Sequence, residues 1–239
     1  MKLLYEIIPL GDSAISIQFG NEISKEANEQ VHLAARKLKA APFPGMIDIV
    51  PAFHTLTLHY NPTAINSADP FQKVCNEVAN RLHAEVTNYS THVPERLIKI
   101  PVCYEEEFAP DLAEVAKTNQ LTKDEVIAIH SSKTYNVYFI GFAPGFPFLG
   151  GMDKRISTPR KNTPRTGIPA GSVGIAGSQT GIYPIDTPGG WQLIGRSPLP
   201  LFLPQAEVPS LLRAGDLVKF VPISRQSFEN WEESAWASK

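Results

Sequence analysis

The chain has 239 residues, enough for one large domain or two small ones with a real hydrophobic core. Its 22 Lys and Arg residues against 24 Asp and Glu residues give a formal net charge of -2, which excludes the basic surface of a typical nucleic-acid-binding protein. No apolar run approaches the roughly 20 residues of a membrane span, and Cys75 and Cys103 lack the spacing of a zinc site. We therefore expect a cytoplasmic globular protein with no nucleic-acid or membrane partner and no metal centre.

The first half alternates short strands with amphipathic helices. Short apolar or alternating runs predict four strands, at residues 3–8, 14–19, 46–50 and 56–60. The apolar residues between Ile23 and Leu38 share one helical face, with Asn21 or Ser24 as the N-cap. Asp69 before Pro70 predicts the start of a second helix. The order ββαββα indicates a small α+β domain over residues 1–88, an antiparallel sheet with two helices.

The second half has many short strands between Gly/Pro turns and few helices. Strands are predicted at 96–104, 135–140 and 217–221, and helices at 111–117 and 122–130, the latter opened by a Thr122/Glu125 capping box. A polar stretch with Pro94 predicts a linker at 89–95. This pattern is typical of a closed β-barrel or a sandwich, here over 96–224, and the tail 225–239 either forms a terminal helix or frays.

Residues 141–195 contain most of the chain's 16 glycines, together with prolines, aromatic residues and arginines. Tight turns between short strands, carried on a rigid scaffold, commonly hold functional residues. Arg160, Arg165 and Arg196 each offer a planar fork that can bind a carboxylate or a phosphate. The alternative for each is a solvated loop charge or a brace for backbone carbonyls. Few acidic residues lie near them in the sequence to neutralise all three.

A second set of residues in and near this segment could line an apolar groove or simply pack in the core. This set contains Phe142, Phe146, Phe148, Tyr183 and Trp191. Ser172 has no evident base partner, so it is not predicted to be a nucleophile. His130 is either a proton carrier or a satisfied core residue. The sequence contains neither a P-loop nor a GxSxG elbow.

Three long runs resemble one protein family. GFAPGFPFLGG at 141–151 resembles the family pattern GFxPGFxYLGG, PRKNTPRTGIPAGSVGIAG at 159–177 resembles PRxxxPRxxVPAGSVxIAG, and YPIDTPGGWQLIGR at 183–196 resembles YPxxxPGGWxxIGR. These patterns are those of the family that contains the 5-oxoprolinase B subunit and allophanate hydrolase subunit 1. Phe148 stands where a tyrosine is usual, so any chemistry that depends on that hydroxyl is absent. The resemblance spans essentially the whole chain.

The resemblance implies a small α+β domain followed by a cyclophilin-like β-barrel domain. It implies one component of an ATP-dependent 5-oxoprolinase, which opens 5-oxoproline to L-glutamate and works beside the C and A subunits of that enzyme. Members are also described as binding the dimerisation and phosphotransfer domain of a sporulation sensor histidine kinase and inhibiting its autophosphorylation. Two alternatives remain: a kinase inhibitor without enzymatic activity, and a stand-alone small-molecule binding domain.

Phosphoryl chemistry on this scaffold would require cations around phosphate. Arg160, Arg165 and Arg196 fit that need, and His130 is a candidate acid or base. Because the chain has no P-loop, we expect ATP, with Mg as a further candidate, to bind across the contact with the C subunit. This chain alone should then be inactive. Phe142, Phe146, Phe148, Ser172, Tyr183 and Trp191 are the expected substrate or partner groove.

Overall fold

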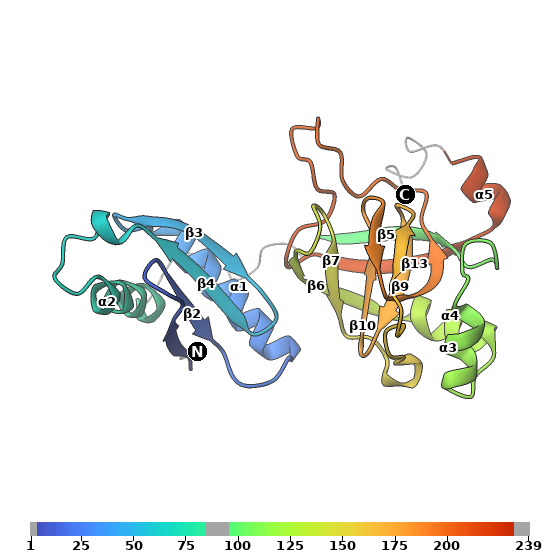
Figure 1. Ribbon diagram of the computed structural model, residues 1–239, viewed down its shortest axis with the longest axis horizontal. Coiled ribbons are helices and arrows are strands. Elements are labelled where there is room, and N and C mark those ends of the chain that lie inside the picture. The colour runs from blue at the N-terminus through green and yellow to red at the C-terminus, as the bar shows by residue number, and fades with distance from the viewer. Residues whose placement is uncertain (1–3, 85–95, 232–239) are drawn as a thin grey trace. The chain divides into compact units, whose positions relative to one another are not determined.

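The computed structural model describes residues 4–84 and 96–231, and the chain divides into two compact units, 1–94 and 95–239. Figure 1 shows a sheet with two helices in the first unit and a barrel in the second. The expected linker at 89–95 and the tail beyond residue 231 lie outside the described residues.

The first unit is an antiparallel sheet with two helices. The strand order is β1-β2-β4-β3, with β1 at Glu6–Pro9, β2 at Ala14–Gln18, β3 at Met46–Pro51 and β4 at Thr55–Tyr60. All three pairings are antiparallel. The helices are α1 at Lys25–Ala40 and α2 at Pro70–His83, and a 3-10 turn, η1, covers Pro62–Ala64. The expected α+β domain is therefore confirmed.

Side-chain caps fix where both helices of this unit begin. The Ser24 hydroxyl accepts a hydrogen bond from the Ala27 amide, so Ser24 and not Asn21 is the cap of α1. The Asp69 carboxylate accepts from Gln72 in the same way, and Pro70 follows at the first helical position of α2. The apolar faces of the two helices and the sheet form one core, which includes Ile15, Ile17, Val31, Leu38, Leu56, Leu58, Val74 and Val78.

The second unit is a closed barrel. Its strands follow one another around the ring in the order β10-β7-β6-β13-β5-β12-β9. Their bounds are β5 Leu97–Cys103, β6 Thr134–Ile140, β7 Pro147–Gly150, β9 Ser172–Ala176, β10 Gln179–Ile182, β12 Gln192–Arg196 and β13 Leu217–Ile223. β13 pairs parallel with β5 and antiparallel with β6. The expected barrel is confirmed, and the sandwich alternative is not.

Short helices and one additional ribbon complete this unit. α3 spans Leu112–Thr118, α4 Lys123–Ser132 and α5 Arg225–Glu229, and a 3-10 turn, η2, spans Lys154–Ile156. The Thr122/Glu125 capping box is present at the start of α4. β8 (Arg165–Ile168) and β11 (Thr187–Gly189) pair as a separate two-stranded sheet. The turn-rich segment 141–195 therefore supplies four barrel strands and this ribbon.

Candidate functional site

Three of the expected groove aromatics form a compact buried cluster. Phe146, Tyr183 and Trp191 are almost fully buried and belong to a small core with Ile168 and Leu193, distinct from the main barrel core. The Phe146 ring meets Tyr183 at 5.2 Å and Trp191 at 5.5 Å between centroids, both in T-shaped geometry. These rings pack against one another, so core packing describes them better than an open groove floor.

Phe148 and Phe142 lie at the margin of this aromatic cluster. Phe148 is half-buried and stacks on Phe139 with ring centroids 4.3 Å apart. Phe142 is 67% exposed, and its ring contacts Phe146 edge-on at 5.4 Å. Its φ of 69° lies in the left-handed region, which costs free energy for a residue other than glycine. The turn at 141–146 therefore holds a large apolar ring outward over buried aromatic residues.

Arg160 connects the aromatic cluster to a polar one. Its guanidinium carbon lies 5.9 Å from the centre of the Trp191 ring, within the range of a cation–π contact. Burial raises the pKa of Tyr183, while a hydrogen bond from the Trp191 backbone and the charges of Arg160 and Arg165 oppose that rise. Both arginines therefore lie near the same phenol.

A buried carboxylate, Asp111, organises the cations of this region. Its Oδ1 accepts hydrogen bonds from Arg165 Nη2 at 2.7 Å and from Lys161 Nζ at 3.0 Å. Its Oδ2 accepts one from the Leu193 amide at 2.7 Å, and the Asp111 amide donates to the Leu193 carbonyl at 2.9 Å. Burial acts to raise the pKa of Asp111, but Arg165, the Leu193 amide and Lys161 together hold the pKa below its ordinary value.

The sequence marks Asp111 only as the start of a helix, and it gives no sign that Lys161 belongs to the site. No spacing rule connects Asp111 to Arg165, which lies 54 residues later in the chain. The two residues meet because α3 begins beside β12 and the 159–165 segment runs along residues 189–193. The Lys161 amide donates to the Gly190 carbonyl, and Arg165 pairs with Gly189. The proximity of Asp111 to Arg165 is therefore a property of the folded barrel and cannot be read from the sequence.

Arg196 and Ser172 lie together at the paired ends of β12 and β9. Arg196 Nε donates to the Ala170 carbonyl at 2.9 Å, so this arginine braces backbone in the way the alternative interpretation proposed. Ser172 is buried, and its carbonyl accepts from the Tyr183 amide at 2.8 Å. Of the three arginines, only Arg165 binds Asp111 directly, and Arg160 lies on Trp191.

His130 is fully buried, and both of its ring nitrogens are hydrogen-bonded. Nε2 lies 3.0 Å from the Thr180 hydroxyl, which itself donates to the Gly174 carbonyl at 2.9 Å. The Thr180 oxygen must therefore accept a hydrogen bond from Nε2–H, and Nδ1, 2.8 Å from the Tyr104 hydroxyl oxygen, accepts a hydrogen bond from that hydroxyl. Burial lowers the pKa of His130 to about 3. The structure gives His130 the position of a neutral core histidine.

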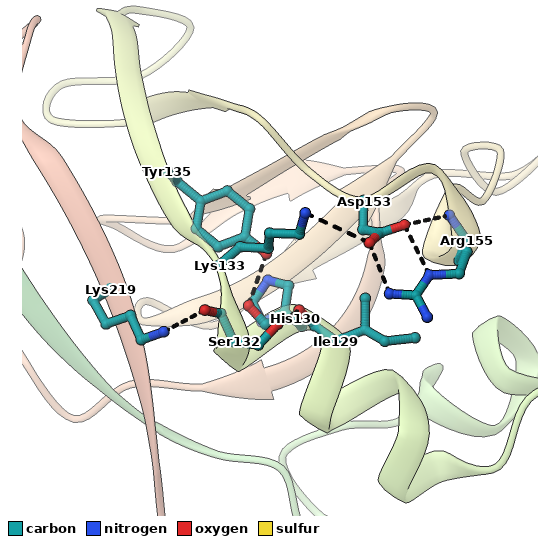
Figure 2. A network of polar contacts seen from close by, with 8 residues as sticks. All are labelled: Ile129, His130, Ser132, Lys133, Tyr135, Asp153, Arg155 and Lys219. Atoms are coloured by element: carbon teal, nitrogen blue, oxygen red, sulfur yellow. Dashed lines mark hydrogen bonds and ion pairs between the residues drawn. The ribbon is translucent and has the colours of Figure 1, made fainter.

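The surroundings of His130 tie the end of α4 to neighbouring elements (Figure 2). The Tyr135 hydroxyl donates to the His130 carbonyl at 2.7 Å, and the Lys219 ammonium donates to the Ser132 carbonyl. Lys133 lies 3.7 Å from Asp153, whose carboxylate also pairs with Arg155 at 2.9 Å. The contacts of Tyr135 and Lys219 satisfy carbonyls at the end of α4, and the ion pairs of Asp153 connect Lys133, just after that helix, to η2.

The described part of the chain offers neither a metal cluster nor a membrane helix. Within 4–84 and 96–231, no three His, Cys, Asp or Glu side chains gather where they could hold a metal ion. In the same residues, no helix has both the length and the apolar character needed to cross a membrane.

Comparisons with known proteins agree with one another. The family described as "Carboxyltransferase domain, subdomain C and D" matches residues 5–212. The 5-oxoprolinase B subunit of Bacillus subtilis (strain 168) is 54% identical over 243 residues, covering 98% of this chain and 100% of that protein. The crystal structure of the protein TTHA0988 is similar at 37% identity with a TM-score of 0.76, over 88% of this chain but 40% of that one.

The N-terminal domain of the histidine kinase inhibitor KipI from Bacillus subtilis is 40% identical over 34% of this chain and 87% of that domain. The TM-score of that match is 0.30. From the family match and the extent of the similarity to the Bacillus subtilis protein, the chain belongs to the carboxyltransferase-domain family of subdomains C and D, in the branch of the 5-oxoprolinase B subunits.

Proposed function

We propose that this chain is the B subunit of an ATP-dependent 5-oxoprolinase, which converts 5-oxoproline, ATP and water to L-glutamate, ADP and phosphate. The observation that carries the proposal is the cation cluster around Asp111, beside buried aromatic rings. It accompanies a full-length similarity to a protein named as the B subunit of 5-oxoprolinase. The use of cytoplasmic ATP would place the protein in the cytoplasm.

The charge balance of the cluster favours an anionic ligand. Arg160, Lys161 and Arg165 bring three positive charges to a region in which Asp111 supplies the buried negative one. Lys161 and Arg165 are half-buried, so their charges are less screened than those of freely exposed side chains. A carboxylate or a phosphate would complete this balance, and 5-oxoproline and ATP carry these groups.

The nucleotide requires a second polypeptide in this proposal. The sequence has no P-loop, the glycine-rich turn that would cradle the phosphates of ATP within one chain. We therefore assign ATP, with any Mg that accompanies it, to a site completed by the C subunit, and the A subunit is required for full turnover. On its own, this chain should not hydrolyse ATP in response to 5-oxoproline.

The test is ATP turnover that depends on 5-oxoproline, measured with the A, B and C subunits together. Arg165→Ala should lower kcat/KM by at least about tenfold, because it removes a half-buried cation from the proposed anion site. Arg213→Ala, an exposed arginine elsewhere on the barrel unit, is the control and should retain full turnover. Wild-type turnover in the absence of 5-oxoproline, or an unaffected Arg165→Ala variant, would contradict the assignment.

Kinase inhibition is a second candidate function, favoured by exposed apolar side chains on the barrel unit. Phe142, Leu203 and Val208 are each at least 46% exposed, and the turn at Gly145 lies against Phe202 in the segment that carries Leu203. Such residues could contact the dimerisation and phosphotransfer domain of a sensor kinase. Phe142→Ser should abolish capture of that purified domain, whereas binding that survives this change would place the interface elsewhere.

A further inference from the structure

Two buried polar atoms beside Asp111 have no hydrogen-bond partner among the described residues. One is a donor, Arg165 Nη1, and the other is an acceptor, Gln192 Oε1. Gln192 is only 6% exposed. Buried polar groups in folded proteins are almost always paired, because an unpaired one has lost its water without replacement. An orphaned donor and an orphaned acceptor in one region therefore require an explanation.

The orientation of each side chain is fixed by its other contacts. Gln192 Nε2 donates to the Pro159 carbonyl at 3.0 Å, and because a carbonyl only accepts, the amide nitrogen must face Pro159. The amide oxygen is then the free end of Gln192. Arg165 Nη2 is held by Asp111 at 2.7 Å, which leaves Nη1 as the free end of the guanidinium.

Arg165 and Gln192 belong to two segments that contact each other, 159–165 and 189–193. Gln192 precedes Leu193 on β12, and the Leu193 amide donates to the carboxylate that holds Arg165. Gln192 reaches Pro159, the Lys161 amide donates to Gly190, and Arg165 pairs with Gly189. Asp111 thus acts as a positioning residue, because it fixes the Arg165 guanidinium next to the strand that carries Gln192.

We propose that Arg165 Nη1 and Gln192 Oε1 recognise the ring amide of a five-membered lactam. A cyclic secondary amide is held in the cis form, so its N–H and C=O point to the same side. The lactam carbonyl accepts from Arg165 Nη1, and the lactam N–H donates to Gln192 Oε1. This inference rests on the proposed function and specifies which part of 5-oxoproline this chain reads.

Access to this pair requires the chain to move. Both atoms are closed off from solvent, and the turn at 160–164, which leads into Arg165, is largely exposed. In this proposal a ligand reaches the two atoms when this turn moves, either by itself or through contact with another polypeptide of the complex. The same requirement is consistent with a chain that is inactive by itself.

The experiment measures ligand affinity of the complete three-subunit complex by calorimetry, with 5-oxoproline and with its lactone counterpart, 5-oxotetrahydrofuran-2-carboxylate. The lactone keeps the ring, the carboxylate and the carbonyl, but has oxygen in place of N–H. Gln192→Leu should weaken 5-oxoproline binding at least about tenfold and change lactone binding less than about twofold. Arg165→Lys, which removes Nη1, should weaken both ligands.

Gln18→Leu, at a half-buried strand glutamine of the other unit, is the matched control and should leave both affinities unchanged. Thermal unfolding of each variant verifies that it is folded. Equal losses for lactam and lactone in Gln192→Leu would identify a structural role and overturn the inference, even with turnover intact in the wild type. Absence of 5-oxoproline-dependent ATP turnover in the wild-type complex would instead refute the proposed function, whatever the binding pattern.

Discussion

Two buried ionisable side chains in the barrel unit reach different charge states for different reasons. His130 bonds through its ring only to the hydroxyls of Tyr104 and Thr180, and burial keeps it neutral. Asp111 is also buried, but two cations and a backbone amide keep it ionised. The first residue makes the protein sensitive to acid, and the second makes the candidate site depend on its counter-ions.

The pH dependence of His130 has a definite sign. Its folded pKa of about 3 is below the ordinary value of 6.5, so the unfolded chain binds the extra proton first as pH falls. The contribution of His130 to the free energy of unfolding is fully present above pH 6.5 and should decrease between pH 6.5 and 3 by roughly 1.4 kcal/mol per pH unit. Urea unfolding at several pH values measures the slope. His130→Gln should remove the slope between pH 6.5 and about pH 5, above the range in which carboxylates such as Asp111 add to it, and His59→Gln, at an exposed histidine, should not.

Removing the charge of Asp111 should destabilise the barrel unit. Asp111→Asn leaves Lys161 and Arg165 without their counter-ion in a half-buried setting. We expect the free energy of unfolding to fall by roughly 1 to 3 kcal/mol, less than for a fully buried ion pair, because both cations reach solvent. Denaturant unfolding at pH 7 checks this. Glu207→Gln, at an exposed loop position, is the control. An unchanged midpoint for Asp111→Asn would show that the cluster contributes nothing to stability.

At the level of single elements, the sequence predicts a helix start well where a neighbouring capping residue determines it. The caps at Asp69 and Thr122 fix the starts of α2 and α4 as predicted, and Ser24, one of two candidates, fixes that of α1. The first strand lies later in the chain than the predicted range 3–8, because β1 spans Glu6–Pro9. The pairing of β11 with β8, and the meeting of Asp111 with Arg165, depend on contacts distant in sequence, and no local pattern encodes them.

Two turn glycines allow the cost of a steric clash to be measured separately from the cost of backbone strain when each is replaced by alanine. Gly171 and Gly177 both have positive φ, but a Cβ at Gly171 would lie 2.1 Å from the Ser197 carbonyl oxygen, whereas nothing lies near one at Gly177. Gly177→Ala should cost about 1 kcal/mol from strain alone. Gly171→Ala should cost several times that, roughly 3 kcal/mol or more, because backbone must move. Comparable thermal midpoints for the two variants would contradict this interpretation.

At the level of the whole molecule, each unit contains a core of its own. Leu58 belongs to the core of the sheet unit, and Ile194 belongs to that of the barrel. The division into an α+β part and a barrel was predictable because the first half alternates strands with amphipathic helices, whereas the second half has short strands between Gly/Pro turns. The family resemblance gave the likeness to the 5-oxoprolinase B subunit, which the comparisons then confirmed.

Separate cores predict separable unfolding. Calorimetry should resolve two transitions, with Leu58→Ala lowering one and Ile194→Ala lowering the other, each by about 2 to 5 kcal/mol in its own unit. Chemical denaturation followed by tryptophan fluorescence should report the barrel unit, since Trp191 lies there and the described part of the sheet unit contains no tryptophan. A single transition shifted equally by both changes would show that the units stabilise one another.

The position of β13 in the ring has a consequence for biosynthesis. This strand, Leu217–Ile223, lies between β5 and β6, the first two strands of the barrel in chain order. While the ribosome is still making the chain, those two strands wait with unpaired edges until residue 223 has emerged. The sheet unit has no such delay, so it can fold during translation. The barrel can close only after β13 has emerged, and until then the two unpaired edges are open to capture by a chaperone.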